Sequence, residues 1–177
     1  AILKSRFEEA AAILRKPTEK GQRKANSLYE LPWYIIIGPP GCGKTTALVN
    51  SGIDFPLADQ FGQESVSGIG GTRNCDWWIS NEAVLIDTAG RYTTQDSDAG
   101  IDSGAWLGFL DLLKKYRRRR PINGAIVAFS LVDLMTFDEE TLAIHCRAIR
   151  RRLQELSERL SISIPVYLAF TKADLVA

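Results

Sequence analysis

The sequence predicts an α/β domain in which helices cover both faces of a mostly parallel β-sheet, giving three layers. Short apolar runs typical of buried strands alternate with longer stretches of helical periodicity. A glycine-rich loop directly follows the first of these apolar runs. Two further strand-like runs are separated by only a short turn. They must therefore pair antiparallel, because a parallel pair needs a longer crossover connection.

The 177 residues are enough for one domain, and their composition is ordinary for a globular protein, with 45% hydrophobic and 24% charged residues. The net charge of +1 indicates no polyanionic partner by itself. Three cysteines without a CxxC or Cys/His spacing favour a reducing compartment over a disulfide framework. No apolar run approaches the ~18 residues that span a membrane. Because the chain begins at an alanine and its single methionine is Met135, we expect a piece of a longer protein.

The first expected elements are a helix and a buried strand joined by a polar connector. Apolar residues recur three or four positions apart through residues 1–16, which predicts an amphipathic helix that ends toward Pro17. Residues 33–37 (WYIII) are too short and too β-branched for a helix, and the glycine loop after them leads into a short helix from 44 to about 50. We therefore expect a helix and linker over residues 1–30 and the domain over 31–177, with the last part of the fold missing.

The remaining elements alternate in the same way. Residues 51–71 form a long segment rich in Gly, Ser, Asp and Gln, of a kind that is usually functional or mobile. The antiparallel strands are CDWWIS and AVLIDT, on either side of the turn at Asn81 and Glu82. A helix over 103–120, a strand over 124–130, a long helix from Asp138 and a strand from Pro165 then follow. The long helix has an apolar stripe of Leu142, Cys146, Ile149, Leu153, Leu156 and Leu160.

The glycine-rich loop matches the phosphate-binding motif G-x-x-x-x-G-K-[ST] in full, and it has the required context between a strand and a helix. Its residues are Gly38, Pro39, Pro40, Gly41, Cys42, Gly43, Lys44 and Thr45. The glycines let backbone N–H groups close on phosphates, and Lys44 adds charge near the β and γ phosphates. Thr45 would offer its hydroxyl to Mg²⁺, and Thr46 its backbone N–H to the α phosphate. The loop predicts binding of Mg²⁺ with GTP or ATP.

A second motif, DTAG, follows a predicted buried strand. A Mg-nucleotide needs a carboxylate opposite the phosphate loop, at the carboxyl end of the neighbouring strand. Asp87 has this position and would reach the metal directly or through water. Gly90, three residues later, could bring its backbone N–H to the γ phosphate and lose that contact after hydrolysis.

The two motifs and the antiparallel pair resemble the translation-factor and Ras-like branch of P-loop GTPases. The resemblance implies that Thr72 is the switch threonine that closes on Mg²⁺ and the γ phosphate. It also implies that TKAD is the base-binding motif N/T-K-x-D, which here begins at Thr171. Asp174 would accept hydrogen bonds from N1–H and the amine of guanine, and Lys172 would lie over the purine. The next base-contacting element of that branch is not in this chain, so GTP and ATP both stay open.

The residue after Gly90 departs from that branch, where a glutamine often orients the attacking water. Here it is Arg91. A guanidinium stays protonated and cannot act as a general base. Arg91 could stabilise charge on the transferring phosphoryl group, or pair with an acidic neighbour and take no catalytic part. We expect slow intrinsic hydrolysis that a partner accelerates.

Over residues 31–175, the segments LPWYIIIGPPGCGKTTAL, GTRNCDWWISNEAVLIDTAGRY and TKADL resemble the cytoplasmic NTPase-like domain of the IcmF/TssM family. These proteins are inner-membrane components of type VI secretion systems. The resemblance implies a place on the cytoplasmic face of the bacterial inner membrane, with the helix over 1–16 leading away from it. The implied partners are TssL-like and TssJ-like subunits and the baseplate. A nucleotide-driven switch and a docking module with optional nucleotide both fit this setting.

Basic residues concentrate in 114–120 and 147–152. They suit nucleic acid, anionic lipid, or solvated helix ends whose charge favours the helix dipole. Without interleaved aromatic residues or a groove-reading helix we expect no nucleic-acid partner, and a docking face fits better. Trp77 and Trp78 are adjacent on a strand and must point to opposite faces. His145 has no catalytic neighbour, and we interpret it as structural or solvated.

Overall fold

A five-stranded β-sheet lies at the centre of the fold, in the order β2-β3-β1-β4-β5. The computed structural model describes residues 2–15, 27–55, 75–95 and 99–176. The strands are β1 (Trp33–Ile37), β2 (Cys75–Ile79), β3 (Val84–Thr88), β4 (Gly124–Ser130) and β5 (Val166–Thr171). β1 pairs in parallel with β3 and β4, β4 pairs in parallel with β5, and β2 runs antiparallel to β3. The predicted α/β class and the antiparallel pair are both confirmed.

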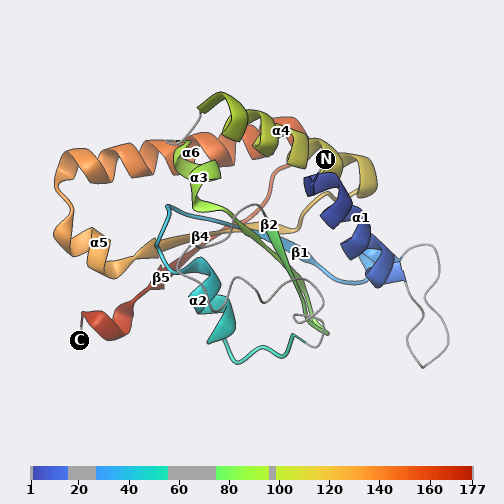
Figure 1. The fold of residues 1–177 in the computed structure, drawn as a ribbon, viewed down its shortest axis with the longest axis horizontal. Helices are drawn as coiled ribbons and strands as arrows, with labels where there is room; N and C mark the ends of the chain where they lie inside the picture. The colour runs from blue at the N-terminus through green and yellow to red at the C-terminus, as the bar shows by residue number, and fades with distance from the viewer. Residues whose placement is uncertain (1, 16–26, 56–74, 96–98, 177) are drawn as a thin grey trace.

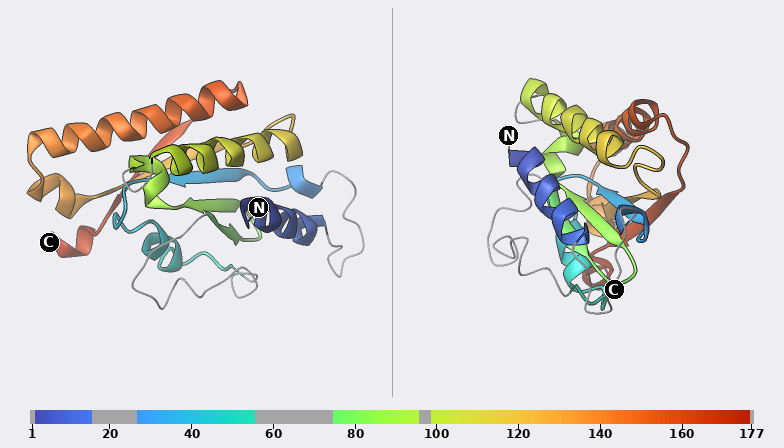
Figure 2. Two further views of the ribbon diagram at one scale, coloured as in Figure 1. Left: turned by 45° about the horizontal axis from the view of Figure 1, so that its top comes forward. Right: turned by 90° about the vertical axis from the view of Figure 1, so that its right-hand side faces the viewer.

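Helices form the outer two layers (Figure 1). The helices α1 (Ile2–Arg15), α4 (Ala99–Tyr116) and α6 (Glu139–Leu160) contribute to the core on one face, and α2 (Lys44–Val49) packs on the other. Figure 2 shows α4 and α6 side by side above the sheet. Four short elements were not predicted from the sequence: η1 (Ser27–Tyr29), α3 (Gly90–Thr94), α5 (Leu131–Thr136) and η4 (Ala173–Leu175). Within the described part of the chain, every helix is too short or too polar to cross a membrane.

The two faces of the sheet have separate apolar clusters, and the adjacent tryptophans divide between them as predicted. Trp77 packs with Trp33 and with Phe7 of α1, at ring-centroid distances of 5.3 and 5.1 Å. Trp78 lies in the cluster on the α2 face and contacts Phe55, with centroids 5.2 Å apart. Every residue of β2 is buried, although β2 is an edge strand.

The long helix α6 begins where its capping residue places it. The Asp138 carboxylate accepts a hydrogen bond of 2.7 Å from the Thr141 backbone N–H, and this bond holds the pKa of Asp138 below its usual range. Most of the predicted apolar stripe is confirmed. Cys146 is the exception, because it is exposed while Leu142 and Ile149 take up the contact with β4.

The two basic clusters are not wholly at the surface, because the structure buries one arginine of each. Arg117 is 1% exposed, and its guanidinium lies over the Trp33 ring at 4.4 Å and the Tyr29 ring at 5.2 Å. Burial lowers the pKa of Arg117 to about 10. Arg152 is 2% exposed and donates to the Tyr92 carbonyl at 3.3 Å. One arginine of each cluster, Arg117 or Arg152, is therefore buried and makes contacts within the core.

Candidate nucleotide-binding site

The phosphate loop runs from the end of β1 to the start of α2, and its backbone needs glycine at three positions. Gly41 and Gly43 have φ of 71° and 89°, in the left-handed region that favours glycine. A Cβ on Gly38 would lie 2.4 Å from the Ala128 carbonyl oxygen. The sequence motif thus folds into a loop pressed against β4.

The Lys44 side chain lies inside this loop. It is 7% exposed, and its ammonium donates to the carbonyls of Gly38 at 2.9 Å and Pro39 at 3.1 Å. The Cys42 sulfur lies 3.8 Å from the same nitrogen. Burial raises the pKa of the Cys42 thiol, so this thiol stays neutral at pH 7. The loop therefore holds one buried positive charge.

Thr45 and Asp87 come together from α2 and β3. The register that pairs Ile36 with Asp87 places this carboxylate beside the start of the loop, where it is fully buried. The Thr45 hydroxyl donates to Asp87 Oδ2 at 2.5 Å. A hydroxyl and a carboxylate are the hard oxygen ligands that Mg²⁺ prefers, so the donor set fits this ion. The structure thus brings together the two residues that the sequence motifs assigned to the metal.

The DTAG glycine packs directly on the loop. A Cβ on Gly90 would lie 2.4 Å from Pro40 Cα and 2.5 Å from Pro40 N. Thr93, one turn further along α3, accepts a hydrogen bond of 3.2 Å from the Gly38 backbone N–H. Sequence reasoning missed Thr93, because a hydroxyl three residues after Gly90 carries no motif of its own. The helix α3 therefore contacts the phosphate loop at two points.

Arg91 is engaged by an acidic neighbour. Its Nε lies 3.0 Å from Asp102 Oδ1, and the Asp102 side chain is 5% exposed. The guanidinium also lies over the Tyr92 ring, 5.0 Å from its centroid. Of the two roles that the sequence left open, the structure contains the pairing with an acidic residue. Asp102 was not anticipated, because it is eleven residues away on another helix.

The TKAD motif, which the sequence analysis compared with a base-binding motif, extends from the end of β5. The Thr171 hydroxyl donates to the carbonyls of Cys42 in the loop and Phe129 in β4, the second at 3.3 Å. Lys172 has a φ of 56°, and Asp174 is exposed in η4. Thr171 thus joins the TKAD motif to the phosphate loop, whereas the Asp174 side chain makes no hydrogen bond or ion pair with the described residues.

Two predicted residues remain to be placed. Thr46 is exposed on α2, one residue beyond Thr45. Thr72, the proposed switch threonine, and most of the 51–71 segment lie outside the described residues.

These features define a class of protein. The fold is the three-layer P-loop NTPase fold in its Ras-like arrangement. Three features define it: a phosphate loop after β1, an acidic residue at the end of the adjacent β3, and an antiparallel β2 at the edge of the sheet.

Residues 99–177 match the IcmF-related N-terminal domain. The chain is also 60% identical over 176 residues to the type VI secretion system component TssM1 of Pseudomonas aeruginosa. This alignment covers 99% of the chain but only 16% of that relative. The chain therefore belongs to the IcmF/TssM family.

Two solved structures resemble the chain more distantly, and both contain GDP. One is an ADP-ribosylation-factor-like GTP-binding protein (small COPII coat GTPase SAR1) from Encephalitozoon cuniculi, with 9% identity, a TM-score of 0.30, and coverage of 97% of this chain and 79% of that one. The other is a GTP-binding protein from Sulfolobus solfataricus, with 13% identity, a TM-score of 0.28, and coverage of 98% and 60%. At such scores neither bears on the function of this chain.

Proposed function

We propose that this chain binds a Mg-nucleoside triphosphate, GTP or ATP, hydrolyses it slowly, and acts as a switch within a type VI secretion membrane complex. The observation that supports binding most strongly is the contact of the Thr45 hydroxyl with the buried Asp87 carboxylate, beside a loop whose carbonyls hold the buried Lys44 ammonium.

Each of these residues has a defined part in binding. Lys44 would turn its ammonium from the Gly38 and Pro39 carbonyls toward the β and γ phosphates, a small movement because it already lies in the loop. Thr45 and Asp87 would hold Mg²⁺, which when bound neutralises phosphate charge. Gly90 would offer its backbone N–H to the γ phosphate from its place against Pro40.

Slow turnover follows from the remaining side chains. Arg91 cannot take a proton from water, and its guanidinium is held by Asp102. Thr72 is proposed to close on Mg²⁺ and the γ phosphate. An activating partner would have to supply the group that orients water, or release Arg91 from Asp102.

The setting follows from family membership. The TssM1 relative is a type VI secretion component, and we place this domain on the cytoplasmic face of the bacterial inner membrane, within a longer membrane protein. TssL-like and TssJ-like subunits and baseplate components are the proposed partners. Residues 31–177 are the proposed NTPase unit. Phe7 of α1 nevertheless packs on Trp33 and Trp77, so α1 shares the core of that unit.

One observation favours a second function, that of a docking module for which nucleotide is optional. Arg91, which stands where related GTPases have the water-orienting glutamine, forms an ion pair with the buried Asp102. A domain kept for docking would retain the fold and have no need of rapid turnover.

Calorimetric titration of MgGTP and MgATP into the wild-type protein and Lys44→Ala distinguishes the nucleotide switch from the docking module. We expect Lys44→Ala to weaken binding by at least about 100-fold, because it removes a buried charge that faces phosphate. Lys115→Ala is the matched control, since it removes an exposed lysine from α4 and should leave binding unchanged. Equal and negligible heats for wild type and Lys44→Ala would favour the docking module.

A further inference from the structure

Four exposed basic side chains lie close together in the sequence where α4 ends: Lys115, Arg118, Arg119 and Arg120. The sequence contains no acidic residue over 112–132. None of the four forms an ion pair with a residue that the structure describes. Because unpaired charges of one sign repel each other, this group favours an anionic partner.

The loop that carries these arginines joins α4 to β4 over residues 117–123, and we call it the arginine loop. Its first residue, Arg117, is buried, with its guanidinium over the Trp33 and Tyr29 rings. Arg117 Nη1 also donates to the Pro121 carbonyl at 3.4 Å, which ties the two sides of the loop together. The buried arginine therefore anchors the loop to the core, beside its three exposed neighbours.

The backbone of the arginine loop is held at two further points. The Arg119 N–H donates to the Tyr29 hydroxyl at 3.3 Å. Asn123 and Trp33 exchange two hydrogen bonds, one of 2.7 Å from the Asn123 N–H to the Trp33 carbonyl and one of 2.9 Å from the Trp33 N–H to Asn123 Oδ1. A loop fixed in this way loses little conformational freedom when it binds, so its arginines are presented from a preorganised backbone.

The arginine loop lies at the opposite end of the sheet from the phosphate loop. It leads into Gly124, the first residue of β4, which pairs with Tyr34 near the start of β1. The phosphate loop follows Ile37, the last residue of β1. Since β1 and β4 run parallel, a partner on the arginine loop would leave the nucleotide site accessible.

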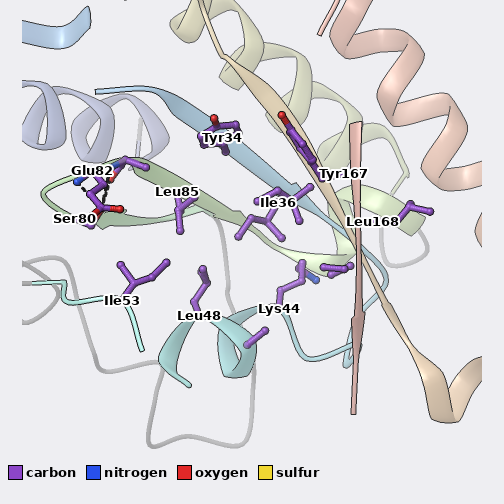
Figure 3. A pocket seen from close by; sticks show the side chains of 15 residues that line it. Tyr34, Ile36, Lys44, Leu48, Ile53, Ser80, Glu82, Leu85, Tyr167 and Leu168 are labelled. Atoms are coloured by element: carbon purple, nitrogen blue, oxygen red, sulfur yellow. Dashed lines mark hydrogen bonds between the residues drawn. The ribbon is translucent and has the colours of Figure 1, made fainter. Parts of the chain in front are cut away.

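The hollow on the α2 side of the sheet is chemically unlike the arginine loop. It has a volume of about 560 Å³, and aliphatic and aromatic side chains predominate in its lining, as Figure 3 shows. None of its lining residues belongs to the arginine loop. The exposed arginines therefore serve neither the hollow nor the nucleotide site.

We propose that the arginine loop, together with Lys115, binds the phosphate groups of an anionic lipid surface. A guanidinium can donate two parallel hydrogen bonds to one phosphate, and it stays charged at physiological pH. Each basic residue near such a surface strengthens binding roughly fivefold, so three arginines together contribute on the order of 100-fold. The binding does not involve nucleotide, so it can fail or succeed separately from the proposed function.

Two other anionic partners fit the loop less well. A protein interface usually has an apolar or aromatic centre inside a polar rim, whereas the exposed side chains over 114–123 are all basic. Single-stranded nucleic acid stacks its bases on aromatic side chains. The two tyrosines beside the loop are engaged within the fold, because Tyr29 contacts Arg117 and Tyr116 donates to Glu8 Oε1 at 2.8 Å. A lipid surface needs only clustered positive charge.

Vesicle flotation of the 177-residue chain tests the proposal. The vesicles are phosphatidylcholine alone, or equal parts of phosphatidylcholine and phosphatidylglycerol. The loop variant combines Arg118→Gln, Arg119→Gln and Arg120→Gln. Its matched control, the α6 variant, removes the same charge from three exposed positions of α6 by Arg147→Gln, Arg150→Gln and Arg151→Gln. Both variants change only exposed side chains, so both should fold, and circular dichroism checks this.

We expect the wild-type chain to bind the anionic vesicles and not the neutral ones, and to be released by high salt. The loop variant should bind the anionic vesicles about 100-fold more weakly than the wild type, because it loses three charges that face the lipid. The α6 variant should lose less than about threefold, because its charges lie away from the bound surface.

Three results would overturn the proposal. The first is equal binding of the wild type to neutral and anionic vesicles, or binding to neither, a comparison that needs no variant. The second is an equal loss in the two variants, which would mean that net charge and not the arginine loop is responsible. The third is tighter binding to duplex DNA or to polyglutamate than to the anionic vesicles, at matched charge and salt, which would identify nucleic acid or an acidic protein as the partner.

Discussion

The two halves of the candidate nucleotide site are built differently. In the phosphate half, Lys44 and Asp87 are buried, and their side chains bond to loop carbonyls and to the Thr45 hydroxyl. In the base half, Thr171 is buried and tied to the loop, but Lys172 lies in the left-handed region and Asp174 is exposed. The phosphate half is part of the core of the domain, whereas the base half is a strand exit at its rim.

This difference implies that phosphate binding and base choice are separable properties of the domain. A change in the phosphate half disturbs buried contacts, so it should affect every nucleotide alike and often stability too. A change in the base half should affect only the nucleotide whose base it contacts. The substitutions below test that separation.

After Lys44→Ala, Asp87→Asn should have the largest effect. Removing the carboxylate charge leaves Thr45 without its anionic acceptor and Mg²⁺ without a protein anion. We expect affinity for MgGTP and MgATP to fall by about 10- to 100-fold, with little change in binding measured without Mg²⁺. Asp54→Asn, which neutralises an exposed carboxylate near α2, is the control. Unchanged Mg²⁺ dependence in the Asp87 variant would remove this residue from the site.

Gly90→Ala should disturb the contact between α3 and the phosphate loop. The new Cβ would meet the Pro40 backbone at 2.4 Å, so one of the two segments must shift. We expect a loss of about 1–3 kcal/mol in the free energy of unfolding, as overpacking costs elsewhere, and a larger loss of triphosphate than of diphosphate affinity. Chemical denaturation and titration measure both.

Gly104→Ala provides the contrast, since a Cβ there meets nothing within 4 Å. In the interior of α4 it should stabilise the protein by about 0.4–1 kcal/mol, because alanine restricts the unfolded chain. A Gly90→Ala protein as stable as Gly104→Ala would show that α3 does not rest on the loop.

Thr171→Val should weaken the link between the two halves. The substitution keeps the shape but removes the hydroxyl that bonds to the carbonyls of Cys42 and Phe129. We expect a loss of about 1–2 kcal/mol in unfolding free energy, because buried carbonyls lose their donor. Thr136→Val removes an exposed hydroxyl bonded within α5 and should change stability by less. Equal losses of stability in the two variants would mean that the Thr171 hydrogen bonds do not contribute measurably to the free energy of unfolding.

How much the sequence could predict depended on the range of the interaction. The loop, the Thr45–Asp87 pair and the division of Trp77 from Trp78 follow from a motif, a strand register and the two-residue period of a strand. Three other contacts do not follow from the sequence: the hydrogen bond between Thr93 of α3 and the loop, the Arg91–Asp102 pair, and the burial of Arg152. Each joins elements whose relative placement is decided by packing, and no local pattern encodes it.

The basic clusters illustrate the same limit. As a run of letters, residues 114–120 indicate a charged surface, because lysine and arginine are seldom buried. Arg117 is nevertheless buried, since Trp33 and Tyr29 present aromatic faces just where α4 has ended. These two rings are distant from Arg117 in the sequence, and only the tertiary fold places them against its guanidinium.

Asp174→Asn should have the smallest effect and the most selective one. If the exposed carboxylate accepts from guanine, exchanging it for an amide should lower affinity for MgGTP by a few-fold to about tenfold, because a solvated charged hydrogen bond contributes less than a buried one. MgATP binding should stay the same, since adenine lacks that pair of donors. Glu82→Gln, at an exposed carboxylate in the β2–β3 turn, controls for charge. A parallel loss for both nucleotides would mean that Asp174 supports the loop and not the base, and the two halves of the site would then not be separable.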